Sequence, residues 1–314
     1  METRESFIEC ENLVKIYKVA DLEVVALQGI DLRIARGEMM ALVGPSGSGK
    51  STLMNILGGL DTPTAGQVRV GQYNLLEMNR HEQVRYRRRE VGFVWQQTAR
   101  NLLPYLTAQE NVELPMALNG IDGRERRARA RELLERVGLV ARLRHRPDRL
   151  SGGEQQRVAI AVSMANHPRL LLADEPTGEV DSEAAEHIFQ VMRAFNRELG
   201  VTIIIVTHDM NVSARVDRVI GMRDGRTSIE VLRRRDTDGR TLSEEEYVIL
   251  DRAGRLQLPQ PFVEHLDMRD RARVRLQGDH IGVWPDGAAP NSPDVPAAPA
   301  PSAADGAADA EEGV

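Results

Sequence analysis

Nearly continuous apolar runs of four to six residues recur along the first 225 positions, each ending in a polar or glycine-rich turn. Such runs are typical of strands buried on both faces of a parallel sheet. We expect them at residues 39–43, 91–95, 170–173 and 201–206. Residues 4–36 instead form short alternating segments between polar turns, which predicts an antiparallel β layer in front of the first buried strand.

Helical patterns separate these strands. Thr107-Ala108-Gln109-Glu110 offers a capping box for one helix, and residues 124–137 place leucine and valine on one stripe of a second. Further helices are expected at residues 158–166 and 181–199. The order predicts an α/β fold with an antiparallel β subdomain and an inserted α-helical subdomain.

Charge and cysteine content limit the function classes. The chain has 41 basic and 47 acidic residues, and residues 286–314 hold acids but neither lysine nor arginine. The remainder is close to neutral, so no whole-chain field favours nucleic acid or acidic lipid. A single cysteine, Cys10, excludes an intrachain disulfide and fits a reducing compartment. No signal-peptide pattern or membrane-spanning run is present, so a membrane role would require a partner.

Composition changes twice after residue 225. Residues 226–245 are polar and arginine-rich, which indicates a linker, and residues 246–285 return to short β segments. Beyond that the chain is mostly Ala, Pro, Gly, Ser and acid, which cannot bury enough apolar surface to order itself. We therefore expect a domain at 1–225, a linker at 226–245, a small β domain at 246–285 and a disordered acidic tail at 286–314.

The strongest chemical signal follows the strand at 39–43. Its spacing, G-x-x-x-x-G-K-[ST], is that of a P-loop, whose backbone N–H groups surround a polyphosphate. The lysine reaches the outer phosphates, the hydroxyl binds Mg²⁺, and the following helix directs its positive end at the anion. The loop residues are Gly44, Pro45, Ser46, Gly47, Ser48, Gly49, Lys50, Ser51 and Thr52. A chance glycine turn is disfavoured because the strand, the loop, the lysine, the hydroxyl and the helix all match the P-loop motif.

Other candidates are weaker when taken singly. Ser151-Gly152-Gly153 at a helix start leaves N–H groups free for a second anion. Asp174 and Glu175 end a buried strand, where open α/β sheets bind ligands. His208 and Gln96 also end strands, where a histidine is more often structural and an amide more often a turn former.

A second motif accompanies the P-loop, with the sequence Leu150-Ser151-Gly152-Gly153-Glu154-Gln155-Gln156. Together with the P-loop, it resembles the signature sequence of the ATP-binding cassette ATPases, and the resemblance spans about residues 7–225. In that family two cassettes pack head to tail, so that each nucleotide is covered by the partner's signature helix. The resemblance therefore implies a P-loop ATPase core, ATP and Mg²⁺ as ligands, and a homodimer.

The resemblance also implies roles. Tyr17, otherwise a packing residue of a strand, would stack on adenine, while the P-loop holds the phosphates. Ser51, Gln96 and Asp174 would hold Mg²⁺. Glu175 would be the general base, with His208 on the γ-phosphate and Gln96 at the attacking water. The residues supplied by the partner subunit would be Ser151, Gly152, Gly153, Glu154 and Asp181.

Three segments resemble the lipoprotein-releasing and macrolide-exporting branch (LolD, MacB) and its relative FtsE. They are Gly58-Gly59-Leu60-Asp61, Gly92-Phe93-Val94-Trp95-Gln96 and Glu110-Asn111-Val112. This implies a cytoplasmic subunit, peripheral on the inner face of the membrane, that drives a separate permease of the FtsX or MacB kind. The chain departs from relatives at Glu179, a charge near the expected interface, and in the segment after Gln96, about two residues longer than usual.

Residues 247–259 and 267–276 are similar to half of an AbrB/SpoVT-type swapped-hairpin domain. Such a short piece favours dimerisation, because about forty residues bury too little surface to fold well alone. Many such domains bind DNA, and several arginines are available, so the alternative is an ABC ATPase with a DNA-binding or regulatory C-terminal domain that acts outside transport. We favour the dimer clamp, since a cassette must dimerise in any case.

Overall fold

The computed structural model describes residues 5–20, 22–97, 101–178, 180–209, 214–235 and 241–286. The chain divides into two compact units between Gln257 and Leu258. The first unit contains the P-loop and every other candidate residue of the nucleotide site. The second contains a short helix and a β-hairpin.

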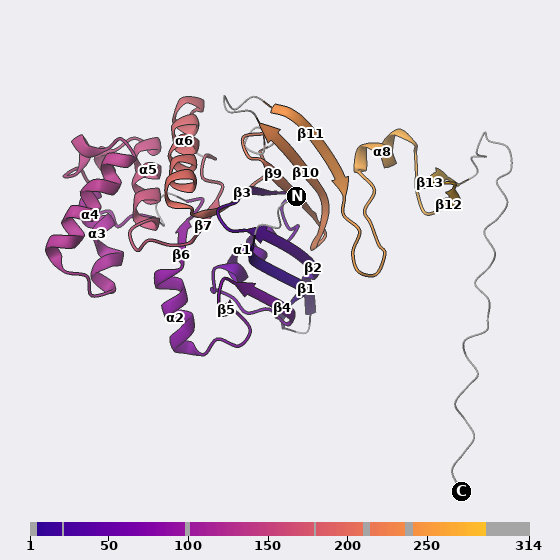
Figure 1. The fold of residues 1–314 in the computed structure, drawn as a ribbon, viewed down its shortest axis with the longest axis horizontal. Coiled ribbons are helices and arrows are strands. Elements are labelled where there is room, and N and C mark those ends of the chain that lie inside the picture. Colours follow the sequence, from indigo (N-terminus) through magenta and orange to yellow (C-terminus); the bar gives the residue numbers. More distant parts are fainter. Residues whose placement is uncertain are drawn as a thin grey trace, which may run out of the picture. The chain divides into compact units, whose positions relative to one another are not determined.

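A mixed sheet forms the centre of the first unit (Figure 1). Within the described residues its order is β11-β10-β9-β3-β8-β7-β6. The bounds are β3 Met39–Val43, β6 Val91–Val94, β7 Leu170–Asp174, β8 Thr202–Thr207, β9 Arg218–Arg223, β10 Arg226–Arg235 and β11 Thr241–Val248. Strands β9, β3, β8, β7 and β6 run parallel to one another, so their carboxyl ends share one edge, whereas β10 pairs with β9 in the antiparallel sense. The predicted buried strands are confirmed, and β3 and β8 are buried along their whole length.

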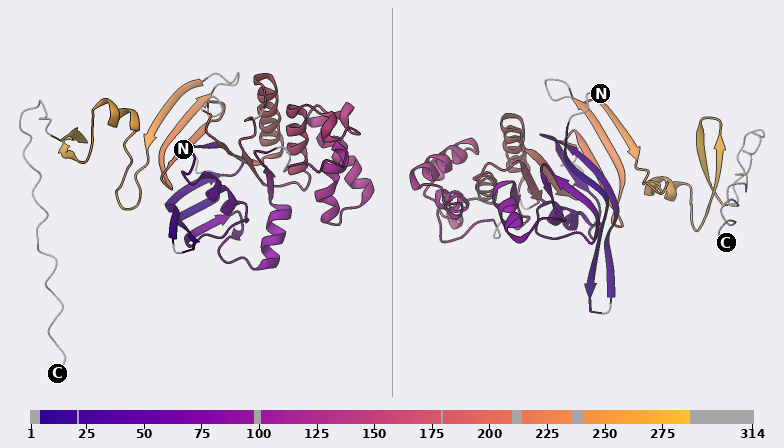
Figure 2. Two further views of the ribbon diagram at one scale, coloured as in Figure 1. Left: turned by 180° about the vertical axis from the view of Figure 1, so that it is seen from behind. Right: turned by 60° about the horizontal axis from the view of Figure 1, so that its bottom comes forward.

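A second sheet is antiparallel, as the alternating pattern of residues 4–36 predicts, and its strand order is β2-β1-β4-β5. Its strands are β1 Ser6–Val19, β2 Leu22–Ala35, β4 Ala65–Val70 and β5 Tyr73–Asn74. Its apolar side shares one core with helix α1 (Lys50–Leu57) and one face of the central sheet. Figure 2 shows β1 and β2 as a long hairpin that projects from the body of this unit. The P-loop helix is therefore held between the two sheets.

Helices cover the other face of the central sheet and build the inserted subdomain. Figure 1 shows α3, α4 and α5 gathered on one flank of the first unit. The helical elements are α2 Arg80–Arg89, α3 Ala108–Leu118, α4 Gly123–Arg136, η2 Val140–Arg142, η3 Pro147–Arg149, α5 Gly152–Ser163 and α6 Ser182–Leu199. The predicted capping box of Thr107 with Glu110 is formed, so the start of α3 follows from local sequence.

The expected linker at 226–245 does not match the structure. Most of this segment forms β10 and β11, which pair with each other and extend the central sheet beyond β9. Arg233 of this segment is neutralised across strands, with its Nε atom 2.7 Å from Glu244 Oε2, and Val231, two residues before Arg233, is buried. Arginine-rich composition hid this pattern, because cross-strand ion pairs depend on a register that composition does not reveal.

The small β domain also begins later than expected. Tyr247 and Val248 belong to β11, and residues 249–257 belong to the first unit. The second unit contains helix α8 (Gln260–His265) and a hairpin of β12 (Ala272–Gln277) with β13 (His280–Pro285). The predicted tail lies outside the described residues, apart from Asp286.

Candidate nucleotide site

The P-loop adopts backbone angles that favour glycine. Gly44, Gly47 and Gly49 have φ values of +152°, +81° and +99°. A Cβ on Gly44 would stand 2.1 Å from the carbonyl oxygen of Met222, so the loop is closely seated against β9. The glycines of the motif are thus required by the path of the chain, and they leave backbone N–H groups uncovered by side chains.

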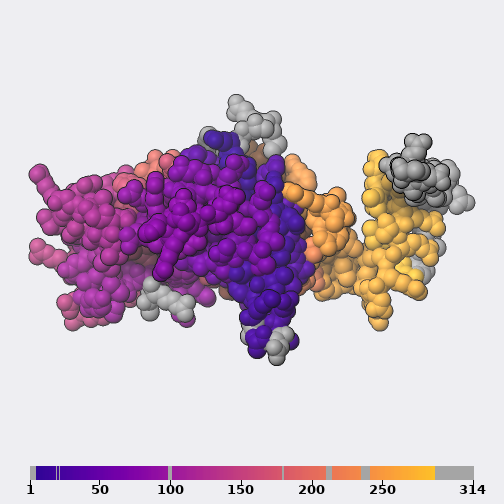
Figure 3. All heavy atoms as spheres, turned by 90° about the horizontal axis from the view of Figure 1, so that it is seen from below, coloured from indigo at the N-terminus to yellow at the C-terminus, as the bar shows by residue number. Residues whose placement is uncertain are grey.

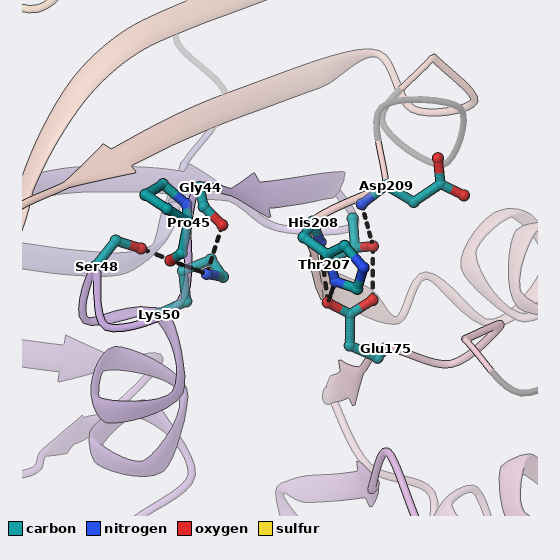
Figure 4. A network of polar contacts seen from close by, with 8 residues as sticks. All are labelled: Gly44, Pro45, Ser48, Lys50, Glu175, Thr207, His208 and Asp209. Carbon is teal, nitrogen blue, oxygen red and sulfur yellow. Dashed lines mark hydrogen bonds and ion pairs between the residues drawn. The ribbon is translucent and has the colours of Figure 1, made fainter.

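Lys50 begins α1 and turns back over the loop (Figure 4). Its ammonium donates to the carbonyl oxygens of Gly44 at 2.7 Å and Pro45 at 2.8 Å, and lies 3.4 Å from Ser48 Oγ. Burial lowers the pKa of Lys50, while the charges of Glu175 and Asp174 oppose that shift. The lysine is therefore a desolvated cation held at the mouth of an anion-binding loop.

A cavity of about 450 Å³ opens over the loop. It gathers residues from the ends of four parallel strands with part of β2. Its lining is Val24, Val25, Ala26, Ser46, Gly47, Gly49, Lys50, Ser51, Thr52, Gln96, Asp174, Glu175, Val206 and His208. Segments far apart in the sequence meet here because the carboxyl ends of the strands share one edge of the sheet.

Glu175 is fixed more tightly than a surface carboxylate. It follows β7 with φ +46°, a left-handed conformation, and its N–H donates to Val206 O at 2.8 Å. Its carboxylate accepts from Thr207 Oγ1 at 2.8 Å and from the backbone N–H of His208 at 2.9 Å. The Nδ1 atom of His208 lies 2.6 Å from Glu175 Oε1 (Figure 4). Sequence reasoning missed Thr207, although it directly precedes the candidate histidine.

Asp174 lines the same cavity, as does Ser51. Burial and the neighbouring Glu175 raise the pKa of Asp174, and Lys50 opposes this shift. Within the described residues, no group of three or more His, Cys, Asp or Glu side chains could hold a metal ion. Mg²⁺ commonly takes only one or two protein oxygens and completes its shell with phosphate oxygens and water. The hydroxyl of Ser51 and the carboxylate of Asp174 fit that pattern.

Tyr17 lies beside the cavity rather than in its lining. It is half-buried in β1 opposite Val24, which does line the cavity. Its hydroxyl donates to Asp61 Oδ2 at 2.6 Å, and the Lys15 ammonium lies 4.7 Å from the ring centroid. Stacking of Tyr17 on adenine stays a prediction.

Gln96 lines the cavity and is exposed. The loop that it opens is closed by Asn101, which accepts from the Trp95 N–H and donates to the Trp95 carbonyl, both at 2.8 Å. This two-way bond anchors the longer segment noted in the sequence. Residues 98–100 and Glu179, the other noted departure, lie outside the described residues.

The signature residues are not in the cavity of their own chain. Ser151 is exposed and caps α5 by a capping box with Glu154. Gly153 is buried against α6, where a Cβ would stand 2.7 Å from Ala184 Cβ. Asp181 caps α6 through the N–H of Ala184 at 2.8 Å and is also exposed. The start of α5 thus offers an anion-binding end to something outside this cavity.

Comparison with known proteins agrees with this geometry. The sequence profile of the family described as "ABC transporter" matches residues 27–178. An "Uncharacterized ABC transporter ATP-binding protein" of Thermotoga maritima is 46% identical over 228 residues, which cover 73% of this chain and 95% of the relative. This chain belongs to the ABC transporter ATP-binding proteins. A relative from Methanocaldococcus jannaschii, MJ0796, is 45% identical over 71% of this ABC ATPase and 96% of its own length.

Solved structures give the same fold. The ATP-binding cassette MJ0796, described as a dimer in a post-hydrolysis state bound to ADP and Pi, aligns with a TM-score of 0.65 at 43% identity. The alignment covers 71% of this ABC ATPase and 97% of that cassette. CbiO1 of Clostridium perfringens, part of the ABC transporter complex cbiONQ, aligns with a TM-score of 0.66 at 29% identity, covering 72% and 88%.

This ABC ATPase binds ATP with Mg²⁺ and hydrolyses it to ADP and phosphate. The glycine loop, the desolvated lysine and the oxygens of Ser51 and Asp174 in the cavity lining suit a magnesium-bound polyphosphate. Among the helices of the described part of the chain, none is both long and apolar enough to cross a bilayer.

Proposed function

We propose that this ABC ATPase is the motor subunit of a transporter of the lipoprotein-releasing and macrolide-exporting type. In this proposal it docks on the cytoplasmic side of a separate permease of the FtsX or MacB kind. ATP-driven pairing of two cassettes then moves a lipid or peptide substrate, or transmits force across the membrane. The observation that supports it most is the connected path from Gln96 in the cavity to the surface of the helical subdomain.

That path is built from the segments that resemble the exporting branch. Phe93 stacks on Trp95 with ring centroids 4.7 Å apart, and a Cβ on Gly58 would stand 1.9 Å from the Phe93 ring. Beyond the Asn101 clasp on Trp95, Asn111 of α3 is 3% exposed. The Asn111 side-chain amide accepts from one backbone N–H and donates to three carbonyl oxygens between residues 103 and 107. A shift at Gln96 therefore has a stiff route to the exposed loop that would meet a permease.

Each chemical group has a proposed role. Glu175 accepts the proton of the attacking water, while His208 and Gln96 contact the γ-phosphate and the water. Ser51 and Asp174 hold Mg²⁺. The partner subunit supplies the signature residues Ser151, Gly152, Gly153 and Glu154, together with Asp181, because these residues are absent from the lining of their own cavity.

We further propose that the hairpin of β12 and β13 is a clamp between two copies of this chain. Val274, Leu276 and Ile281 share one face and are each more than 60% exposed. An isolated two-stranded hairpin is marginal in water, and a second copy offers the same apolar face. The opposite face, with Arg273 and Arg275, is the one that would bind DNA. Loss of dimer in Ile281→Asp, measured by sedimentation, supports the clamp, whereas retardation of duplex DNA by the intact chain at low salt supports the alternative.

Capture of the permease tests the main proposal. Glu175→Gln should retain ATP because its P-loop is unchanged, and it is expected to carry an integral-membrane permease through purification from detergent-solubilised membranes. Lys50→Ala, which loses the phosphate-binding ammonium, is the matched control and should carry less. Recovery of soluble proteins alone with both variants contradicts the proposal, even where the wild-type chain hydrolyses ATP.

A further inference from the structure

A strap, residues 249–255, follows β11 and lies against the antiparallel sheet of the first unit. The backbone N–H of Ile249 donates to Ser228 O of β10 at 2.9 Å. The Ile249 side chain packs on the core shared by the antiparallel sheet and α1. Figure 3 shows the orange surface of this part of the chain beside the indigo surface of the N-terminal strands. The strap thus adds a layer of contacts outside the nucleotide site.

Asp251 closes the strap into a turn. Its Oδ1 atom accepts from the N–H groups of Ala253 and Arg255, both at 2.9 Å. Its own N–H donates to Arg255 O at 2.9 Å, and Gly254 provides the left-handed residue with φ +74°. One carboxylate oxygen thus maintains the turn, which leaves Oδ2 directed at other partners.

Three ion pairs attach this turn to the cassette. Arg252 Nε lies 3.0 Å from Asp31 Oδ1, and an Arg252 guanidinium nitrogen lies 3.7 Å from Glu11 Oε1. Asp251 Oδ2 lies 3.2 Å from Arg226 Nη1, with both side chains about four-fifths buried. Because the pairs reach strands β1, β2 and β10, the strap joins the antiparallel sheet to the central one.

Arg226 connects the strap to the P-loop. Its Nη2 atom donates to Gln28 Oε1 at 3.1 Å, while Gln28 donates from its side chain to Asp224 O at 2.9 Å. The Gln28 N–H donates to Gly225 O at 2.8 Å, and the Gly225 N–H donates to Ser48 O of the P-loop at 3.1 Å. An unbroken series of hydrogen bonds therefore runs from Asp251 to the phosphate-binding loop.

We propose that Asp251 and Arg226 are positioning residues for nucleotide binding. Through Gln28, they hold the turn at Asp224 and Gly225 against Ser48, so that the P-loop is preorganised for the polyphosphate. The inference relies on the P-loop as the nucleotide site and is independent of the permease proposal. It assigns the segment after β11 a role in affinity for ATP.

The test compares full-length variants by steady-state ATPase assays and by titration with MgADP. Asp251→Asn keeps a side-chain oxygen for the turn but removes the charge that faces Arg226. It is expected to raise the KM for ATP and the Kd for MgADP about two- to fivefold, the range of a partly exposed ion pair, with kcat unchanged. Arg255→Ala is the matched control: it removes another Asp251 partner that has no contact with Arg226, and should leave both constants unchanged.

Two further measurements give independent readouts: the KM of a double variant, and hydrogen exchange in a variant whose strap is released. If Asp251 acts through Arg226, then adding Arg226→Met to Asp251→Asn should raise KM no further than Arg226→Met alone. Arg252→Glu places like charge against Asp31 and Glu11, so it should free the strap and speed hydrogen exchange at the Ile249 amide. A freed strap with unchanged KM and Kd overturns the inference, as does a change in kcat or melting temperature alone.

Discussion

Glu175 holds a left-handed backbone conformation, which costs a non-glycine residue about 1–3 kcal/mol. Surrounding contacts enforce it: its N–H is bound by Val206 O, and its carboxylate by Thr207 and His208. The strain directs the carboxylate into the cavity next to the P-loop. Strained residues of this kind cluster at functional sites, which agrees with the role proposed for Glu175.

Glu175→Gln should reduce ATP hydrolysis about 10²- to 10⁴-fold, because the amide cannot accept a proton from water. MgADP binding should persist, since the P-loop is untouched. The measurement is phosphate release beside nucleotide titration, with Glu77→Gln, an exposed glutamate outside the cavity lining, as the control. Hydrolysis near the wild-type rate in the purified variant contradicts the assignment of Glu175 as base.

Asp174→Asn should make the nucleotide-free and metal-free protein more stable at pH 7. Burial and Glu175 raise the pKa of Asp174, so the native state binds this proton more tightly than the unfolded chain does. Ionisation of Asp174 at neutral pH therefore destabilises the fold, and asparagine removes that term. Thermal melts in EDTA should show a higher Tm for the variant, and the gain should shrink as the pH falls toward the ordinary aspartate pKa of 3.8. A gain that grows on acidification excludes this explanation.

Helices α5 and α6 approach each other closely at Gly153, the second residue of the signature helix. A Cβ on Gly153 would stand 2.7 Å from Ala184 Cβ, closer than two such atoms pack. Exposed Ser151, the cap of this helix, lies two residues earlier and depends on this placement. The position of a residue proposed to act on the partner subunit is thus fixed by packing inside its own chain.

Gly153→Ala should destabilise the chain by about 1–3 kcal/mol, the cost of overpacking, and lower ATPase activity more than MgADP affinity. Adding Ala184→Gly removes the opposing methyl group and should restore part of the activity, despite a helix-propensity cost of about 1 kcal/mol. Denaturant unfolding and phosphate release check the two effects. If Ala184→Gly restores nothing, the close approach is not the reason for glycine at 153.

At the scale of the whole molecule, the main property is that the signature residues lie outside the nucleotide cavity of their own chain. The lining of the nucleotide cavity contains neither Ser151 nor Gly153, although it contains Lys50 and Glu175. The solved cassette MJ0796, 43% identical to this chain, is described as a dimer. A complete reaction centre is therefore expected only where two chains meet.

Mixing two inactive variants tests whether one chain supplies the signature to the P-loop of the other. Lys50→Ala lacks a working P-loop, and Ser151→Asp places a charge at the exposed signature while keeping a side chain that can cap the helix, so each homodimer should be inactive. A mixed dimer keeps one intact pair of P-loop and signature. With random pairing, half of the dimers are mixed, and each mixed dimer has one working site out of two. The mixture should therefore recover about a quarter of wild-type activity. A mixture as inactive as its components refutes supply in trans.

Local chemistry made the P-loop and the helix starts predictable from sequence. The glycines of the P-loop and the hydroxyls of Thr107 and Ser151 specify backbone angles and caps within a few residues. Buried strands were equally clear from their apolar runs. The proposed roles at Glu175 and His208 came from family resemblance, since a lone histidine after a strand is more often structural.

Tertiary structure alone decided how distant segments combine. It placed residues 226–235 and 241–248 in the central sheet as β10 and β11, and it brought Asp251 to Arg226 and Thr207 to Glu175. Sequence determined the elements and the phosphate loop, because those depend on neighbours along the chain. Register, ion pairs and strain depend on neighbours in space, so only the folded chain could reveal the strap, the fixed carboxylate and the exclusion of the signature from its own site.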